Sequence, residues 1–215
     1  MKKLAVLISG QGSNLQAIID ACDAGNIEGK VCVVVSNRAE AAGLERARLA
    51  GIPSLVIDHR GFADRESFDQ ALLEALASFV PDLVILAGFM RILTPEFIAQ
   101  YQGRLLNIHP SLLPLYPGLD THRRALESGD SQTGATVHFV TNELDGGPPI
   151  LFARVPIATG DTPESLAQAV QRREHDIYPA VTRWFLQDRL LLAPDGAYLD
   201  GALLPRQGLD ADQLS

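Results

Sequence analysis

The segment Asn107-Ile108-His109-Pro110-Ser111 places an amide and an imidazole two residues apart at the end of an apolar run. Alternate residues of an extended strand point to the same face, so we expect Asn107 and His109 to share one face. An amide N–H can stabilise a developing oxyanion, and an imidazole can act as a general acid or base. Alternatively, both side chains only satisfy backbone groups at a strand end. Position alone favours the catalytic interpretation over the structural one.

A carboxylate that could assist this pair is Asp145, in the loop Leu144-Asp145-Gly146-Gly147. A loop aspartate before two glycines most often makes an Asx-type hydrogen bond to nearby backbone. The glycines also allow the loop to fold inward and direct Asp145 toward His109. A carboxylate there would raise the pKa of His109 above the ordinary value of about 6.5 and favour the protonated form. The residues alone leave both interpretations open.

A third candidate site is the loop Ser9-Gly10-Gln11-Gly12-Ser13-Asn14, which leaves an apolar run and enters a segment of helical period. Glycines let backbone amides turn toward a ligand, and a helix N-terminus attracts anions. The loop lacks the Gly-Lys-Ser/Thr of a P-loop, and Leu15 replaces the third glycine of the dinucleotide fingerprint. A single phosphate, as on a phosphoribosyl group, therefore fits better than a pyrophosphate. A tight turn in which Ser13 caps the helix explains the loop equally well.

The remaining histidines and cysteines do not form a metal-binding pattern. His122 and His138 could join His109, but HxxxH and HxxH spacings are absent and no cysteine ligand accompanies them. His138 lies inside a β-rich run, where we expect either a core histidine or a partner that orients a site residue. Cys22 and Cys32 lack CxxC spacing and are expected to be inert core thiols.

An α/β framework is expected to position these residues. Short runs rich in Val, Ile and Leu lack apolar/polar alternation, which predicts strands buried on both faces: Leu4–Ile8, Val31–Ser36, Leu55–Ile57, Leu83–Ala87 and Leu105–Ile108. Segments of helical period lie between them: Asn14–Asp23, Gly43–Ala50, Ser67–Phe79 and Pro95–Tyr101. This repetition predicts an open, mostly parallel twisted sheet with helices on both faces. Ligands of such sheets bind at the carboxyl ends of the strands.

The pattern changes after residue 108. Ala135–Val140 and Pro149–Val155 are β-rich runs, which predict an antiparallel C-terminal extension of the sheet. One long helical pattern then runs from Thr162 to Asp188. The tail Arg189–Ser215 contains the turn signal Pro194-Asp195-Gly196 and ends in polar residues that are expected to fray.

Length and charge exclude several classes of function. The chain has 215 residues, 47% of them hydrophobic and 20% charged, which is typical of a globular protein and predicts a single domain. A net charge of −8 opposes a broad nucleic-acid or anionic-membrane surface, although one local anion site remains compatible with it. The first apolar run, Leu4–Ile8, is too short for a signal peptide. We therefore expect a cytoplasmic protein.

Read together, these segments resemble the glycinamide ribonucleotide formyltransferase family, the folate-dependent formyl-transfer enzymes of purine synthesis. The resemblance covers nearly the whole chain and rests on these strings: Leu7–Gln16, Leu86–Leu93, Leu106–Pro114, Gly134–Val140 and Asp145–Pro148. Asn-x-His-Pro-Ser-Leu-Leu-Pro followed by Asp-Gly-Gly is specific to folate formyltransferases and their relatives. The Gly-Ser-Asn loop indicates the glycinamide ribonucleotide branch.

One departure from the family pattern is visible. Leu115 and Asp120 stand where some bacterial members carry Lys and His. Both positions flank the Pro117-Gly118 loop, so the departure concerns the electrostatics of that loop and not the core chemistry.

The resemblance implies a Rossmann-like formyltransferase fold in one domain, 1–215. Its phosphate-binding part would span about 1–100, its folate-binding and catalytic part about 101–190, and its tail 191–215. The implied reaction transfers the formyl group of 10-formyltetrahydrofolate directly to the amine of glycinamide ribonucleotide, through a tetrahedral intermediate, on the route to IMP.

The resemblance also implies roles for individual residues. Asn107, His109 and Asp145 would be catalytic, with His138 as a possible supporting neighbour. Residues expected to bind glycinamide ribonucleotide are Gly12, Ser13, Asn14 and Glu174. Residues expected to bind the folate are Arg65, Met90, Arg91, Ile92, Leu93, Asn107, Thr141, Asn142, Glu143, Leu144 and Asp145. The expected ligands are two small molecules, without metal, nucleic acid or membrane, bound by a monomer or homodimer.

Three other functions are compatible with parts of the sequence. A formyltetrahydrofolate hydrolase would use the same trio with water, but such enzymes usually carry an N-terminal regulatory domain, and here the sheet is expected to begin at Leu4. A methionyl-tRNA formyltransferase needs a C-terminal RNA-binding domain, for which Arg189–Ser215 is too short. A non-catalytic nucleotide-binding module remains possible if the loops are only turns.

Overall fold

Four parallel strands form the sheet of Met1–Leu106, one of the two compact units into which the chain divides. The computed structural model describes residues 1–214. The strands are β1 (Lys2–Ile8), β2 (Gly29–Ser36), β3 (Ser54–Val56) and β4 (Leu83–Leu86). They lie in the order β3-β2-β1-β4, and every pairing is parallel. Residues Leu4–Ile8 are completely buried, as their lack of alternation predicts.

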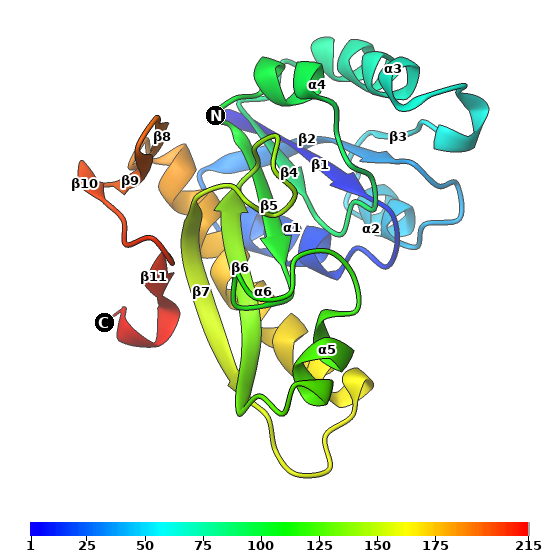
Figure 1. Cartoon of the computed structure of the whole chain (residues 1–215). Coiled ribbons are helices and arrows are strands. Elements are labelled where there is room, and N and C mark those ends of the chain that lie inside the picture. Colours follow the sequence, from blue (N-terminus) through cyan, green and yellow to red (C-terminus); the bar gives the residue numbers. More distant parts are fainter. Residues whose placement is uncertain (215) are drawn as a thin grey trace. The chain divides into compact units, whose positions relative to one another are not determined.

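Helices cover both faces of this sheet (Figure 1). They are α1 (Ser13–Asp23), α2 (Gly43–Leu49), α3 (Arg65–Ala77) and α4 (Pro95–Gln100), with a short 3₁₀ turn η1 (His59–Gly61) before α3. The chain moves from β1 to β3 in one direction and then returns across the sheet to β4. Right-handed crossovers therefore place α1 and α2 on one face and α3 on the other.

The carboxyl ends of these strands are tied together by one buried serine. Ser9 directly follows β1, and its Oγ donates to Asn37 Oδ1 after β2 at 2.6 Å. The same Oγ accepts a hydrogen bond from the backbone N–H of Met90, after β4, at 2.8 Å. The loops that follow β1, β2 and β4 are thus held at a single edge of the sheet.

The second unit, Asn107–Ser215, contains most of β5 (Leu105–His109), whose first two residues belong to the first unit. Its other sheet strands are β6 (Gln132–Phe139), β7 (Pro149–Pro156) and β11 (Leu209–Asp210), in the order β5-β6-β7-β11. β6 and β7 are antiparallel, whereas β11 is parallel to β7. The predicted antiparallel extension is therefore confirmed.

One long helix stabilises the second unit. α6 (Pro163–Leu186) packs on β6 and β7, burying one side of the helix against them. Its start is a capping box: Ser165 N donates to Thr162 Oγ1 at 3.2 Å, and Thr162 N donates to Ser165 Oγ at 3.0 Å. A shorter helix, α5 (Thr121–Glu127), also contacts α6.

The tail is more ordered than its polar sequence predicts. It forms an antiparallel sheet of β8 (Leu190–Ala193), β9 (Gly196–Leu199) and β10 (Ala202–Leu203), and the chain then enters β11 and a 3₁₀ turn η2 (Ala211–Gln213). The predicted turn before β9 is confirmed. The expected fraying is wrong through residue 214, because Asp210 pairs with Arg154 of β7 and Asp212 pairs with Arg173 of α6.

The predicted fold class is confirmed: parallel strands with helices on both faces, followed by antiparallel structure. Several elements differ from expectation in their bounds or existence, β3 and α5 among them. β3 is Ser54–Val56, not Leu55–Ile57, and α5 occupies residues for which the sequence suggested no element. Among residues 1–214, no helix is long and apolar enough to cross a membrane.

Candidate active site

Asn107 and His109 project from β5 toward one cluster of polar side chains in the second unit. Asn107 Nδ2 lies 3.1 Å from Nε2 of His138, and His109 Nδ1 lies 3.4 Å from Oδ2 of Asp145. His138 and Asp145 are themselves neighbours, with 3.8 Å between Nε2 and Oδ1. Ile108, between the two site residues, is buried away from solvent. These contacts confirm the prediction that the side chains of Asn107 and His109 lie on the same face of β5.

The two glycines after Asp145 allow its loop to fold back on β6. A Cβ added to Gly147 would lie 1.8 Å from the carbonyl oxygen of Phe139, so only glycine fits there. Asp145 has φ of 50°, a left-handed conformation that aspartate tolerates better than most residues. Its Oδ2 accepts a hydrogen bond from the distant backbone N–H of Gly118 at 2.9 Å. The carboxylate thus serves contacts far along the chain, including His109, and not a local Asx turn.

Both ring nitrogens of His109 face oxygen atoms. Nε2 is 2.8 Å from the carbonyl oxygen of Tyr116, which can only accept, so Nε2 carries a hydrogen. Nδ1 faces the Asp145 carboxylate. With its hydrogen on Nε2, a neutral imidazole would direct a lone pair at that carboxylate, whereas an imidazolium would form an ion pair with it. The arrangement therefore suits a protonated His109, itself almost completely buried.

His138 sits beside Asn107 in the neutral form. Its Nδ1 lies 2.8 Å from the carbonyl oxygen of Phe139, so the hydrogen is on Nδ1 and Nε2 accepts from Asn107. Burial lowers the pKa of His138 to about 4, an effect only partly opposed by the Phe139 carbonyl and by Asp145. A neutral His138 therefore orients the side-chain amide of Asn107 so that the NH₂ group faces the imidazole ring. One N–H of this NH₂ group bonds His138, and the other can donate to a ligand.

This pKa predicts acid-sensitive folding. Between about pH 6.5 and about pH 4 the unfolded chain binds a proton at His138 that the folded chain does not, so stability falls as the pH falls through that window. The shift corresponds to on the order of 3 kcal/mol over the whole window. Urea unfolding of a His138→Gln variant at neutral pH and near pH 5 should therefore show a smaller acid-induced loss than the wild type. An equal loss in both proteins would contradict the neutral assignment.

The candidate phosphate loop in the first unit is shaped by Gly12. This residue has φ of 69°, and a Cβ on it would lie 2.6 Å from Cα of Gly43. Gly12 occupies the N-cap position of α1 without a side-chain hydrogen bond, so the interpretation of Ser13 as a cap is wrong. Arg46 stands beside the loop, where its Nε donates to the carbonyl oxygen of Gln11 at 2.8 Å. The N-terminus of α1 therefore lacks a side-chain cap and lies beside the cation Arg46. Both features favour the binding of an anion there.

The expected folate-binding residues lie in both units. In the first unit, Met90 and Ile92 expose 56% and 57% of their surface, whereas Leu93 is buried. Arg91 lies over the ring of Phe68, 5.8 Å from its centroid, and Arg65 is the first residue of α3. In the second unit, Thr141–Asp145 lie in the loop between β6 and β7, and Glu174 is a buried residue of α6. The exposed Met90 and Ile92 offer apolar surface to a ligand.

Several contributors to the cluster were not predicted. Two are backbone groups, the Tyr116 carbonyl and the Gly118 N–H, which carry no signature of residue type. His122 of α5, considered from the sequence only as a possible metal ligand, lies close enough for the charge of His109 to lower its pKa, although burial is the larger cause. Within the described part of the chain, no group of three or more His, Cys, Asp and Glu residues could hold a metal ion.

Known proteins share both the sequence and the fold. The family model for formyl transferase matches residues 2–182. The chain is 56% identical to the phosphoribosylglycinamide formyltransferase of Escherichia coli (strain K12) over 210 residues, which cover 98% of this chain and 99% of the relative. The corresponding enzyme of Haemophilus influenzae is 50% identical over 97% of this chain and 98% of its own length.

The fold gives the same assignment. The structure of the Coxiella burnetii phosphoribosylglycinamide formyltransferase aligns with a TM-score of 0.93 and 46% identity, over 97% of this chain and 98% of that one. The resemblance carried by the Asn-x-His-Pro-Ser and Asp-Gly-Gly strings is thereby confirmed. With a family match over most of its length and relatives of its own size, the chain belongs to the formyl transferase family.

Proposed function

We propose that this protein transfers the formyl group of 10-formyltetrahydrofolate to the amine of glycinamide ribonucleotide, as a phosphoribosylglycinamide formyltransferase of purine (IMP) synthesis. The observation that carries the proposal is the cluster of Asn107, His109, Asp145 and His138 in the second unit. Family membership implies a folate-type one-carbon donor, and relatives of nearly identical length carry this activity in their names.

The reaction requires stabilisation of an oxyanion. When the glycinamide amine attacks the formyl carbon, a tetrahedral centre forms and negative charge develops on the formyl oxygen. Asn107 donates to that oxygen through the N–H that His138 does not use. Protonated His109 provides a second, charged donor. For this its Nε2–H leaves the Tyr116 carbonyl oxygen and bonds the formyl oxygen of the substrate instead. One such preorganised donor is worth on the order of 3 kcal/mol of barrier.

Asp145 completes the proton balance. The attacking amine loses a proton as the new carbon–nitrogen bond forms, and the folate nitrogen gains a proton as the old bond breaks. Asp145 holds His109 in its imidazolium form across the 3.4 Å contact and assists movement of this proton, directly or through a water. The step needs no covalent enzyme intermediate and no redox cofactor.

Binding residues are proposed on each unit separately. In the first unit, Gly12–Asn14 would bind the substrate phosphate, and Arg65 with Met90–Leu93 would contact the folate. In the second unit, Thr141–Asp145 would meet the pterin and Glu174 the glycinamide amine. The αL conformation of Gly12 and the exposure of Met90 and Ile92 support these assignments.

The phosphate assignment gives a prediction at Ser13. Ser13→Asp places a carboxylate beside the substrate phosphate, so the KM for glycinamide ribonucleotide should rise about tenfold or more, with kcat little changed. An acid in the first turn of a helix favours the helix, so the variant should remain folded. Steady-state kinetics with Ser13→Ala as the uncharged control would test this. A KM in Ser13→Asp equal to that in Ser13→Ala would move the phosphate elsewhere.

The proposed activity can be tested by following an isotopically labelled formyl carbon. Purified protein is incubated with glycinamide ribonucleotide and a folate whose formyl carbon is isotopically labelled, and the products are identified by mass spectrometry. We expect the label in formylglycinamide ribonucleotide. Label recovered only as formate would instead identify the hydrolase that uses the same trio with water, a function that the full-length relatives do not favour.

Both substrates are small molecules, and we propose a cytoplasmic enzyme that works as a monomer or homodimer. Cys22 and Cys32 are free thiols, as expected in a reducing compartment. The net charge of −8 gives no reason to propose a nucleic-acid or membrane partner.

A further inference from the structure

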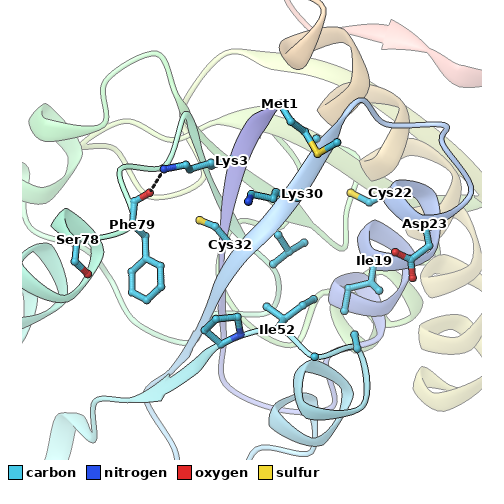
Figure 2. A pocket seen from close by; sticks show the side chains of 15 residues that line it. Met1, Lys3, Ile19, Cys22, Asp23, Lys30, Cys32, Ile52, Ser78 and Phe79 are labelled. Carbon is cyan, nitrogen blue, oxygen red and sulfur yellow. Dashed lines mark hydrogen bonds between the residues drawn. The ribbon is translucent and has the colours of Figure 1, made fainter.

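A cavity of about 780 Å³ lies in the first unit at the amino ends of β1, β2 and β3 (Figure 2). It is lined by the starts of β1 and β2, the end of α1, the segment between α2 and β3, and the residues after α3. Because the strands are parallel, this edge is opposite the one that carries loop 9–14 and segment 88–93. Cavities of this volume accommodate a small organic ligand.

The cavity exists because β3 is short. β3 pairs only with Val34–Ser36, although β2 begins at Gly29 and pairs with β1 along its whole length. The first residues of β2 therefore border an opening on the side of β3 instead of a neighbouring strand. Ala50–Pro53 form the far wall of this opening.

Two lysines line the cavity on neighbouring strands. Lys3 and Lys30 are direct partners in the register of the parallel strands β1 and β2. The Lys3 ammonium donates to the Phe79 carbonyl oxygen at 3.1 Å, a neutral acceptor drawn in Figure 2. Across residues 1–214, neither ammonium has an ion pair with a carboxylate. An anion placed between them could pair with both ammonium groups.

The carboxylates in the neighbourhood do not provide that anion. Asp82 uses Oδ2 to accept from the backbone N–H of Lys3 at 2.7 Å, not from its ammonium group. Asp23 also lines the cavity, but from the end of α1, across the view from Lys3 in Figure 2. Among the described residues, neither Lys3 nor Lys30 is thus neutralised by a direct carboxylate contact, although Asp23 and Asp82 lie nearby.

Part of the remaining lining is apolar, beside the polar Asp23 and Ser78. Ile19, Val31, Ile52, Pro53 and Phe79 contribute hydrocarbon surface. Met1, which lines the cavity, exposes 89% of its surface, and Leu49 and Val80, each next in sequence to a lining residue, expose 72% and 69%. Val80 has φ of 49°, an outlier for a β-branched residue. Apolar surface beside two cations matches a ligand with a hydrocarbon body and an anionic head.

We propose that this cavity binds a small amphipathic carboxylate, with its anionic head between Lys3 and Lys30 and its apolar body along Ile52 and Phe79. The site is separate from formyl transfer and does not depend on the proposed function. Lys3 and Lys30 attract the carboxylate locally, although the negative net charge of the whole chain repels it. The apolar residues of the cavity bury the hydrocarbon part of the ligand.

The two cysteines of the chain both line the cavity and can report its occupancy (Figure 2). Burial, followed by the charge of Asp23, raises the pKa of Cys22 to about 11. Burial also raises the pKa of Cys32, partly offset by Lys3 and Lys30. Both thiols are therefore protonated near neutral pH and should react slowly with alkylating agents. A ligand in the cavity would slow them further.

The test uses decanoate as the probe, at submicellar concentration, and N-ethylmaleimide labelling of both cysteines followed by mass spectrometry. Decanoate should slow labelling in a saturable way, and the uncharged decanamide should protect less. Lys30→Gln should raise the half-protecting concentration of decanoate about fivefold, the size expected for loss of one partly exposed ion pair. Arg48→Gln removes a cation of α2 that pairs with Glu45 outside the cavity, and should leave protection unchanged.

Each other outcome would overturn the proposal. Absence of protection by decanoate would remove the cavity as a ligand site. Equal protection by decanamide, or an unchanged response in Lys30→Gln, would remove the anionic head. Protection that grows with protein concentration, together with a dimer in sedimentation, would assign the cavity to a second copy of the chain.

Discussion

Asp145→Asn is expected to lower kcat by about 10²–10⁴-fold while leaving the KM of both substrates within a small factor. Asparagine has the size of aspartate, so the contacts of the loop with the substrates should persist. It lacks the negative charge that stabilises an imidazolium across the 3.4 Å contact with His109. The buried setting strengthens this charge effect, because neither side chain is well solvated.

Steady-state kinetics and a thermal melt of the same preparations would measure this effect. Asp195→Asn is the matched control, since it makes the same chemical change at an exposed aspartate that bonds to Tyr198 in the small antiparallel sheet. The control should retain its turnover. Near-normal turnover in folded Asp145→Asn would show that the carboxylate does not support the reaction.

Asn107→Asp is expected to reduce kcat by about 10²–10³-fold or more, the loss associated with one oxyanion donor. The substitution replaces an N–H donor with a negative charge where the formyl oxygen itself becomes negative. It also removes the hydrogen that His138 Nε2 accepts at 3.1 Å, so His138 should gain a proton to bond the new carboxylate.

This double consequence separates the proposed role of Asn107 from simple damage to the fold. Titration of His138 by NMR should show its pKa rising well above about 4 in Asn107→Asp, alongside the lost turnover. Asn26→Asp, in the loop between α1 and β2, is the matched control and should change neither quantity. Loss of turnover with an unchanged His138 titration would mean that Asn107 does not hold the geometry described here.

Much of the fold follows from local patterns in the sequence. The buried strands of the first unit are continuous apolar runs, and the helices between them show a 3.6-residue period, so their positions could be predicted within a few residues. α5 was missed because it has only seven residues and little apolar periodicity, although Gly129 after it is a typical helix end. The order of the tail depends on pairings of Asp210 and Asp212 with arginines far along the chain, which no local pattern reveals.

The site was predictable where residue type carries the chemistry. Asn107, His109 and Asp145 could be singled out from a strand end and an Asp-Gly-Gly loop, and the structure brings them together. Their catalytic roles stay predictions. His138 was open between a core histidine and an orienting partner, and its contact with Asn107 favours the partner. The Tyr116 carbonyl and the Gly118 N–H could not be foreseen, because any residue supplies a backbone group.

The cap of α1 shows a different limit. A serine at the start of a helix predicts a side-chain cap, but the left-handed conformation of Gly12 moves the N-cap one residue earlier and makes Ser13 the first helical residue. Because glycine occupies the N-cap, no side chain caps the start of α1. This supports the proposal that an anion binds there.

The most direct test is a crystal structure with a tetrahedral adduct that joins glycinamide ribonucleotide to a folate analogue. The amide nitrogen of Asn107 and a ring nitrogen of His109 should both lie within hydrogen-bonding distance of the oxygen on the tetrahedral carbon, with Asp145 still against the imidazole. An adduct bound away from Asn107 and His109, or an Asp145 carboxylate turned away from the imidazole, would contradict the account.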